Sequence, residues 1–149
     1  MKRRAHHVMA LCVGIAVTSF LGMVSGAMAQ ESAADSMADG VVAFYFHGNV
    51  RCATCKKIEA YADEAVHSGF PEALEEGALA WRVVNIDDEG NRHFIQDFQL
   101  VTRSVVLAEI RGGKVVRWQN LDKVWQLVRD KERFVDYIQG ETGDFLGTS

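Results

Sequence analysis

The chain has 149 residues, and its 20 Asp and Glu outnumber its 16 Lys and Arg, which gives a formal net charge of −4. An acidic protein repels phosphate groups, so this balance argues against binding to nucleic acid and against electrostatic docking on anionic lipid. The length suits a single domain whose hydrophobic core needs no disulfide scaffold.

The N-terminus has the pattern of a secretory signal peptide over residues 1–29. A basic start is followed by a largely apolar stretch over residues 8–24. Ala27-Met28-Ala29 supplies the small residues that signal peptidase requires before its cut, so we expect cleavage after Ala29 and a periplasmic or secreted mature protein. An uncleaved signal would be the alternative, and it is the only association with a membrane surface or interior that we expect for the chain itself.

Cleavage would change both the charge and the cysteine content of the protein. The mature chain would keep 13 Lys and Arg against 20 Asp and Glu, a net charge of −7, and it would lose Cys12. Cys52 and Cys55 would then be its only cysteines. Residues 30–40, rich in Ala, Ser and Asp, are expected to form a flexible lead-in. Residues 41–149 are expected to form one domain.

The first predicted elements are a buried strand and an amphipathic helix. Residues 41–46 are a continuous apolar run of β-branched and aromatic residues, which is typical of a strand buried on both faces. After a loop, apolar residues recur at intervals of three and four from Ala53 onward, as they do on one face of a helix. Gly69 and Pro71 are expected to end this helix.

The remaining elements follow from the same two periodicities. In chain order they are a short helical stretch at 72–76, a strand at 79–86, a helix at 89–98, strands at 105–110 and 114–118 that form a hairpin, and a helix at 122–139. Asp122 is expected to cap the last helix. The order β-α-β-α-β-β-α predicts an α/β fold, a thioredoxin-like three-layer sandwich with a mixed central sheet.

Cys52 and Cys55 stand where the first helix begins. Residues three apart on a helix lie about 5–6 Å apart, within the range of about 4.4–6.8 Å between Cα atoms that a disulfide tolerates. Unpaired N–H groups and the helix dipole favour an anion at Cys52, and Arg51, Lys56 and Lys57 add positive charge nearby. We therefore expect the pKa of the Cys52 thiol to be lowered into the reactive range of roughly 3.5–7.5, with Cys55 as the resolving thiol.

Two other uses of the cysteine pair remain open. Two thiolates are ligands for Cu(I) and similar soft ions, and VRCATCKKIEAY is similar to the loop of heavy-metal-associated domains. Those domains run β-α-β-β-α-β and carry a methionine where this chain has Val50, and a third soft ligand would have to come from His47 or a partner. A purely structural staple is disfavoured, because a bridge that closes so short a loop constrains the unfolded chain little.

The segments FYFHGNVRCATCKKIEAYADEAV and GGKVVRWQNLDKVWQLVRDKERFVDYI resemble the exported thioredoxin-like proteins of the ArsF family, which carry the name nitrophenyl compound nitroreductase subunit. The resemblance covers most of the mature chain. It implies a thioredoxin-like fold with Cys52 and Cys55 as the paired cysteines of the family. Nothing in the sequence has the pattern of a flavin site, so the expected redox group is the cysteine pair itself and no bound cofactor. A non-catalytic subunit of a redox complex is a further alternative.

The sequence departs from ordinary thioredoxins at two places. Ala53 and Thr54 stand between the cysteines where thioredoxins have Gly-Pro, and no tryptophan precedes the pair. The loop before the third strand reads Thr102-Arg103-Ser104, where thioredoxins usually place a cis-proline beside the cysteines. The identity of the substrate therefore does not follow from the resemblance.

Three residues near the pair are candidates for auxiliary roles. His47 could stabilise the Cys52 thiolate or shuttle a proton, or it could simply pack against the end of the strand. Ser104 lies in the loop that lacks the proline, and Tyr45 is either a core residue or a hydrogen-bond donor to the pair. The predicted function is an exported thiol–disulfide oxidoreductase or electron-transfer protein. Its expected partner is a protein thiol or disulfide, in solution or in a membrane.

Overall fold

The computed structural model describes residues 38–147, so the predicted signal peptide over 1–29 and most of the predicted lead-in lie outside the described residues. Four strands form one sheet in the order β2-β1-β3-β4. The strands are β1 (Gly40–His47), β2 (Leu79–Asn85), β3 (Ser104–Arg111) and β4 (Lys114–Asn120). β1 runs parallel to β2 and antiparallel to β3, and β3 forms the predicted hairpin with β4.

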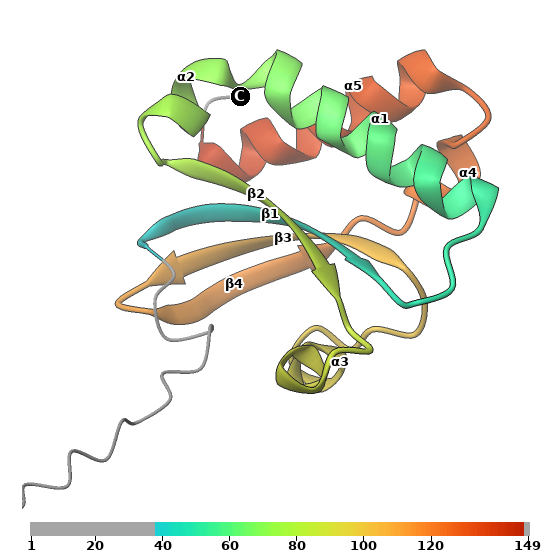
Figure 1. Cartoon of the computed structure of the whole chain (residues 1–149). Helices are drawn as coiled ribbons and strands as arrows, with labels where there is room; N and C mark the ends of the chain where they lie inside the picture. The colour runs from blue at the N-terminus through green and yellow to red at the C-terminus, as the bar shows by residue number, and fades with distance from the viewer. Residues whose placement is uncertain (1–37, 148–149) are drawn as a thin grey trace, which may run out of the picture. The chain divides into compact units, whose positions relative to one another are not determined.

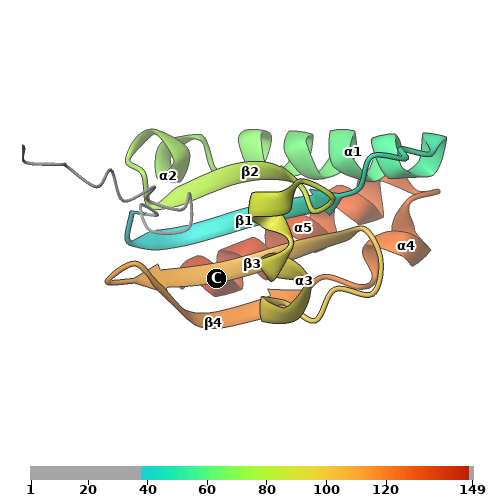
Figure 2. The ribbon, with the colours of Figure 1, turned by 60° about the horizontal axis from the view of Figure 1, so that its bottom comes forward.

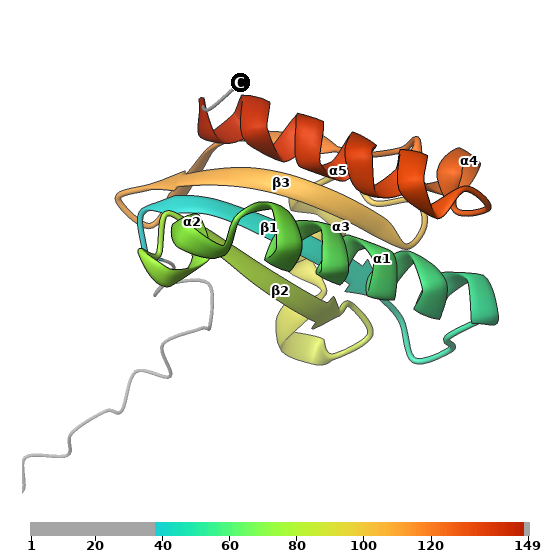
Figure 3. The ribbon, with the colours of Figure 1, turned by 90° about the horizontal axis from the view of Figure 1, so that it is seen from above.

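Helices cover both faces of this sheet (Figures 1 and 2). α1 (Ala53–Gly69) and α5 (Lys131–Leu146) run side by side over one face, as Figure 3 shows from above. The opposite face carries α3 (His93–Asp97). The short helices α2 (Pro71–Glu75), η1 (Glu89–Asn91) and α4 (Val124–Leu127) lie in the connections. The element order, the strand directions and the three layers are those of the thioredoxin-like sandwich, which confirms the predicted fold class.

The central strand β1 is buried on both of its faces, as its continuous apolar run predicted. Val41, Ala43 and Tyr45 pack into the core beneath α1 and α5. The alternate residues Val42, Phe44 and Phe46 pack into the core beneath α3. This alternation follows from the two-residue period of a strand, and it gives each helical layer a separate hydrophobic core.

Four phenylalanine rings hold α3 against the sheet, and we call them the phenylalanine cluster: Phe44, Phe46, Phe94 and Phe98. Every pair of these rings is in contact, with centroids 5.1 to 5.8 Å apart. Aromatic pairs in this distance range add packing energy beyond the area they bury. A helix of only five residues would not be stable alone, so this packing is what orders the segment that leads into the loop before β3.

The last predicted helix is wrong in its boundaries and in its cap. The sequence predicted one helix over 122–139 capped by Asp122, whereas the structure has two helices, α4 and α5, separated by Val128, Arg129 and Asp130. Asp130 is extended, and its carboxylate accepts a hydrogen bond from the backbone N–H of Arg133 at 3.2 Å, so it is the N-cap of α5. Within residues 38–147, no helix is both long enough and apolar enough to cross a membrane.

Candidate functional site

Cys52 and Cys55 are joined by a disulfide at the start of α1. Cys52 is the N-cap residue of this helix, and its Sγ accepts a hydrogen bond from the backbone N–H of Cys55 at 3.0 Å. The two Cα atoms are 5.0 Å apart, within the range that a disulfide tolerates. The bridge predicted from the helical spacing is therefore present. Because Cys52 precedes the first helical turn, opening the bridge requires no unwinding of α1.

The two sulfur-bearing residues differ in their access to solvent. Cys52 is exposed, whereas Cys55 is only 3% exposed. Cys55 shares the inward face of α1 with Ile58 and Ala62, three and seven residues further on, and both of these are fully buried. A sulfur from another molecule can therefore reach Cys52 but not Cys55. The predicted roles of nucleophile and resolving thiol require this asymmetry.

Tyr45 lies directly beneath the cysteine pair. Its side chain is fully buried, and its hydroxyl donates a hydrogen bond to the backbone carbonyl of Cys55 at 2.7 Å. Burial raises the pKa of the Tyr45 hydroxyl, while the charges of Arg51 and Arg103 act in the opposite direction. The hydroxyl therefore stays protonated and keeps its donor. Both sequence interpretations of Tyr45 are correct, since it is a core residue and it also holds the first turn of α1.

We expect Tyr45→Phe to lower the free energy of unfolding by about 1 kcal/mol, because it removes one buried hydrogen bond. The bond ends on the backbone of Cys55 and not on its sulfur, so the loss should be equal in the oxidised and reduced protein. Urea denaturation of both forms measures this. Tyr61→Phe is the matched control, because the ring of Tyr61 contacts Phe134 edge-on and its loss of a hydroxyl should cost less than about 0.5 kcal/mol. A loss confined to one redox form would contradict the backbone role.

The loop that leads from β1 to Cys52 is anchored by one side chain at the end of β2 and one just after it. The backbone N–H of Asn49 donates to Asp87 Oδ2 at 2.7 Å, and the side-chain amide of Asn85 donates to Asn49 Oδ1 at 2.9 Å. A Cβ on Gly48 would lie 2.8 Å from Asp87 Oδ2, so only glycine fits without moving that carboxylate. Asp87, two residues after β2, thus positions the loop before the cysteines.

Arg103 connects the loop before β3 to the loop before α1. Its Nη2 donates to the backbone carbonyl of Val50 at 2.9 Å, and its own carbonyl accepts a hydrogen bond from the Trp125 indole at 3.0 Å. Residues 38–147 contain no cis peptide bond, so the loop at Thr102-Arg103-Ser104 is trans throughout. In this chain a side-chain bridge joins the two loops at the place where thioredoxins usually have a cis-proline. The sequence showed the missing proline but not the bridge.

Three basic residues lie near the cysteine pair in the sequence, and they differ in their surroundings. Arg51 forms an ion pair with Glu59, the seventh residue of α1. Lys56 and Lys57 are exposed. The cationic surroundings predicted for Cys52 are therefore present, but the charge of Arg51 is partly neutralised.

The two remaining auxiliary candidates make backbone contacts. His47 Nδ1 lies 3.0 Å from the carbonyl oxygen of Gly48, within its own loop. The Ser104 hydroxyl donates to the carbonyl of Thr102 at 3.0 Å and lies 3.4 Å from the side-chain amide of Asn120. These contacts stabilise the two loops beside the site. A direct role for either side chain in sulfur chemistry stays a prediction.

The soft-metal alternative concerns the reduced protein, since both sulfurs are joined in the disulfide here. In the described part of the chain, no three His, Cys, Asp or Glu side chains are grouped as metal ligands. The element order differs from that of heavy-metal-associated domains, because α3 lies between β2 and β3. Metal binding by Cys52 and Cys55 alone, or with a ligand from a partner, stays a prediction.

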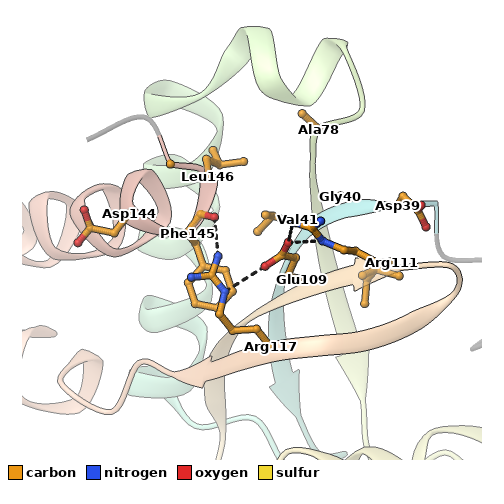
Figure 4. A pocket seen from close by; sticks show the side chains of 12 residues that line it. Asp39, Gly40, Val41, Ala78, Glu109, Arg111, Arg117, Asp144, Phe145 and Leu146 are labelled. Atoms are coloured by element: carbon orange, nitrogen blue, oxygen red, sulfur yellow. Dashed lines mark hydrogen bonds and ion pairs between the residues drawn. The ribbon is translucent and has the colours of Figure 1, made fainter.

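A pocket of about 780 Å³ lies at the other end of the sheet from the cysteines, beside the first residues of β1 and the last residues of α5. Figure 4 shows Glu109 between two arginines: it accepts a hydrogen bond from Arg111 at 2.6 Å and one from Arg117 at 3.0 Å. The bond from Arg111 is the main cause that lowers the pKa of the Glu109 carboxyl. Arg117 also donates to the carbonyl of Phe145 and stacks on its ring. The contacts of these charged groups connect β3, β4 and α5 to one another.

No protein-family model matches this chain. No curated protein matches it either. Among solved structures, the chain is similar to the crystal structure of Chlamydomonas reinhardtii thioredoxin f2, at 16% sequence identity and a TM-score of 0.38, over 64% of this chain and 82% of that one. The thioredoxin-like fold is defined here by the strand order β2-β1-β3-β4, the strand directions and the helical layers.

Proposed function

We propose that this protein is a thiol–disulfide oxidoreductase whose working group is the Cys52–Cys55 pair. One observation carries the proposal: a disulfide at the N-terminus of α1 joins an exposed sulfur to a buried one. A structural bridge needs no such difference in access, whereas two-step exchange with a partner needs one reachable sulfur and one sheltered sulfur. The bridge also closes a very short loop, so its contribution to the stability of the fold is small.

The exchange has two steps, each of which breaks one S–S bond and forms another. The Cys52 thiolate attacks a partner disulfide, and the partner's other sulfur leaves as a thiolate. The Cys55 thiolate then attacks Cys52 Sγ in the mixed disulfide and releases the second partner thiolate. Two electrons pass from the protein to the partner, and the structure represents the oxidised product. The same steps in reverse oxidise a partner dithiol.

We propose further that the protein works outside the cytoplasm and belongs with the ArsF-family thioredoxin-like proteins. The leader pattern over residues 1–29 supports export, and an oxidising compartment suits a pair that alternates between dithiol and disulfide. The similarity around Cys52 and in the C-terminal segment supports the family. A nitroreductase role would require a flavin partner, and in that case this chain would serve as an electron-transfer subunit.

The reduction potential of the cysteine pair tests the proposed activity. The purified protein is equilibrated with dithiothreitol or glutathione buffers, and free thiols are then alkylated and counted by mass spectrometry. We expect a potential between about −120 and −270 mV, the range of exchanging dithiols. A potential below about −300 mV would identify an inert structural bridge. Failure to exchange with any disulfide, together with tight Cu(I) binding by both reduced thiols, would support the soft-metal alternative instead.

A further inference from the structure

The two most exposed large apolar side chains in the described part of the chain lie on the loops beside the cysteines. Val50 is 76% exposed on the loop before α1, and Val101 is 94% exposed on the loop before β3. Burying an aliphatic side chain of this size is favourable, because it removes apolar surface from water. Apolar side chains gathered beside a reactive sulfur, on two loops held together by Arg103, are the features of a contact surface for another chain.

A small pocket of about 190 Å³ has Val101 on its lining, together with Gly48 from the loop that carries Val50. Its apolar wall is formed by Ile86, Ile95 and Leu100. Arg103 lines one part of this pocket and Asp87 another. The Asp87 carboxylate already accepts the N–H of Asn49, so its negative charge is held in place. The pocket therefore has the size of one amino-acid side chain and two charges of opposite sign on its lining.

Arg103 has positive charge that no carboxylate neutralises within residues 38–147. Its Nη2 is bonded to the carbonyl of Val50, and its Nε is buried without an acceptor. Arg51, its neighbour around Tyr45, is instead paired with Glu59. A guanidinium group presents donors in a fork that matches a carboxylate. A carboxylate from outside the chain would therefore neutralise the charge of Arg103 through the outer end of its side chain.

We propose that the redox partner is a polypeptide whose reactive cysteine is flanked by an apolar residue and an acidic residue. The apolar side chain enters the pocket lined by Ile86, Ile95 and Leu100, and the carboxylate binds Arg103. Asp87 repels the carboxylate and so orients the segment. The inference rests on the proposed thiol–disulfide exchange and names the substrate class of that same site. The sulfur chemistry is unchanged: the partner disulfide accepts two electrons from Cys52 and Cys55.

The test uses symmetric disulfides of short peptides that differ in one residue beside the cysteine. Val-Cys-Asp, Val-Cys-Asn and Val-Cys-Lys are compared as oxidants of the reduced protein, and Gly-Cys-Asp measures the apolar contribution. We expect the second-order rate constant to be about tenfold higher for Asp than for Asn, with Lys slowest, and the preference should shrink as salt rises. Replacing Val by Gly should slow the reaction about fivefold.

Two variants assign the preference to Arg103. In Arg103→Gln the ratio of the Asp to the Asn rate constants should fall close to one, and in Arg103→Lys it should be intermediate. Arg129→Gln is the matched control, because Arg129 is exposed in the turn between α4 and α5, and its ratio should equal that of the wild type. The preference for an acidic peptide is measured first on the wild-type protein. It can therefore be confirmed or rejected even if a variant fails to fold.

The failure of this inference can be distinguished from the failure of the proposed function. Bis(2-hydroxyethyl) disulfide, which is small and uncharged, is offered to the reduced wild-type protein. If it is not reduced, and no peptide is either, the proposed exchange activity is wrong. If it is reduced but the Asp, Asn and Lys peptides react equally fast, the exchange activity stands and the acidic partner is overturned.

Discussion

Replacing Cys52 by serine should abolish thiol–disulfide exchange, whereas replacing Cys55 by serine should trap a mixed disulfide with the partner. Cys52 is the exposed sulfur and Cys55 is 3% exposed, so a partner reaches only Cys52. A serine hydroxyl is not a nucleophile at neutral pH without an activating base, so Cys52→Ser should lower the exchange rate by at least about a thousandfold. In Cys55→Ser the first step proceeds, but no thiolate is present to release the partner.

Both outcomes can be read by mass spectrometry after incubation with bis(2-hydroxyethyl) disulfide. Cys55→Ser should gain the mass of one mercaptoethanol group, and Cys52→Ser should gain little within the same time. Thr54→Ser is a matched control, because it changes an exposed residue between the cysteines and leaves both sulfurs in place. If Cys55→Ser stays unmodified while Cys52→Ser forms the adduct, the assignment of the two sulfurs is reversed.

Phe46→Ala should destabilise the protein by about 3–5 kcal/mol. Phe46 is fully buried, and its ring contacts those of Phe44, Phe94 and Phe98. A small domain has only about 5–15 kcal/mol of stability in total, so this single change should remove a large share. Because the cluster orders α3, the substitution should also loosen the loop that carries Val101 and Arg103.

Urea denaturation followed by tryptophan fluorescence measures this effect. Trp118 contacts Phe98 edge-on with centroids 5.7 Å apart, so its emission should report the loss of packing around α3. Val116→Ala is the control, because Val116 is 55% exposed on β4 and its truncation should change stability by less than about 0.5 kcal/mol. A loss below about 1 kcal/mol in Phe46→Ala would mean that α3 is held mainly by other contacts.

The fold could be predicted largely from the sequence because its strongest signals are local. The apolar run at residues 41–46 predicted a central strand, and the Gly-Gly turn at 112–113 predicted a hairpin. The cysteine spacing predicted the bridge for the same reason, since residues 52 and 55 are three apart at a helix start. The break at Asp130 was missed because apolar periodicity continues across it. Aspartate is a common N-cap residue, so Asp130, which stands between two stretches of helical periodicity, was the available signal for a new helix start.

The surroundings of the cysteine pair could not be predicted because they depend on contacts between distant segments. Arg103 and Val50 are far apart in the sequence, and no local pattern relates them. The bond from Tyr45 to Cys55 depends on how α1 packs over β1, which sequence periodicity does not specify. The same holds for Asp87 and Asn49, which meet only because β1 and β2 are parallel neighbours.

The central place of β1 in the sheet has a consequence for biogenesis. Among the strands of residues 38–147, β1 is the first to be synthesised, yet it pairs with β2 and β3, which are made later, with a register that joins Gly40 to Ile110. Such non-local pairing slows folding and leaves the apolar run at 41–46 unpaired, and prone to aggregation, until residues 79–110 are available. The cysteines are only three residues apart and need no such closure. Their oxidation can therefore precede completion of the sheet.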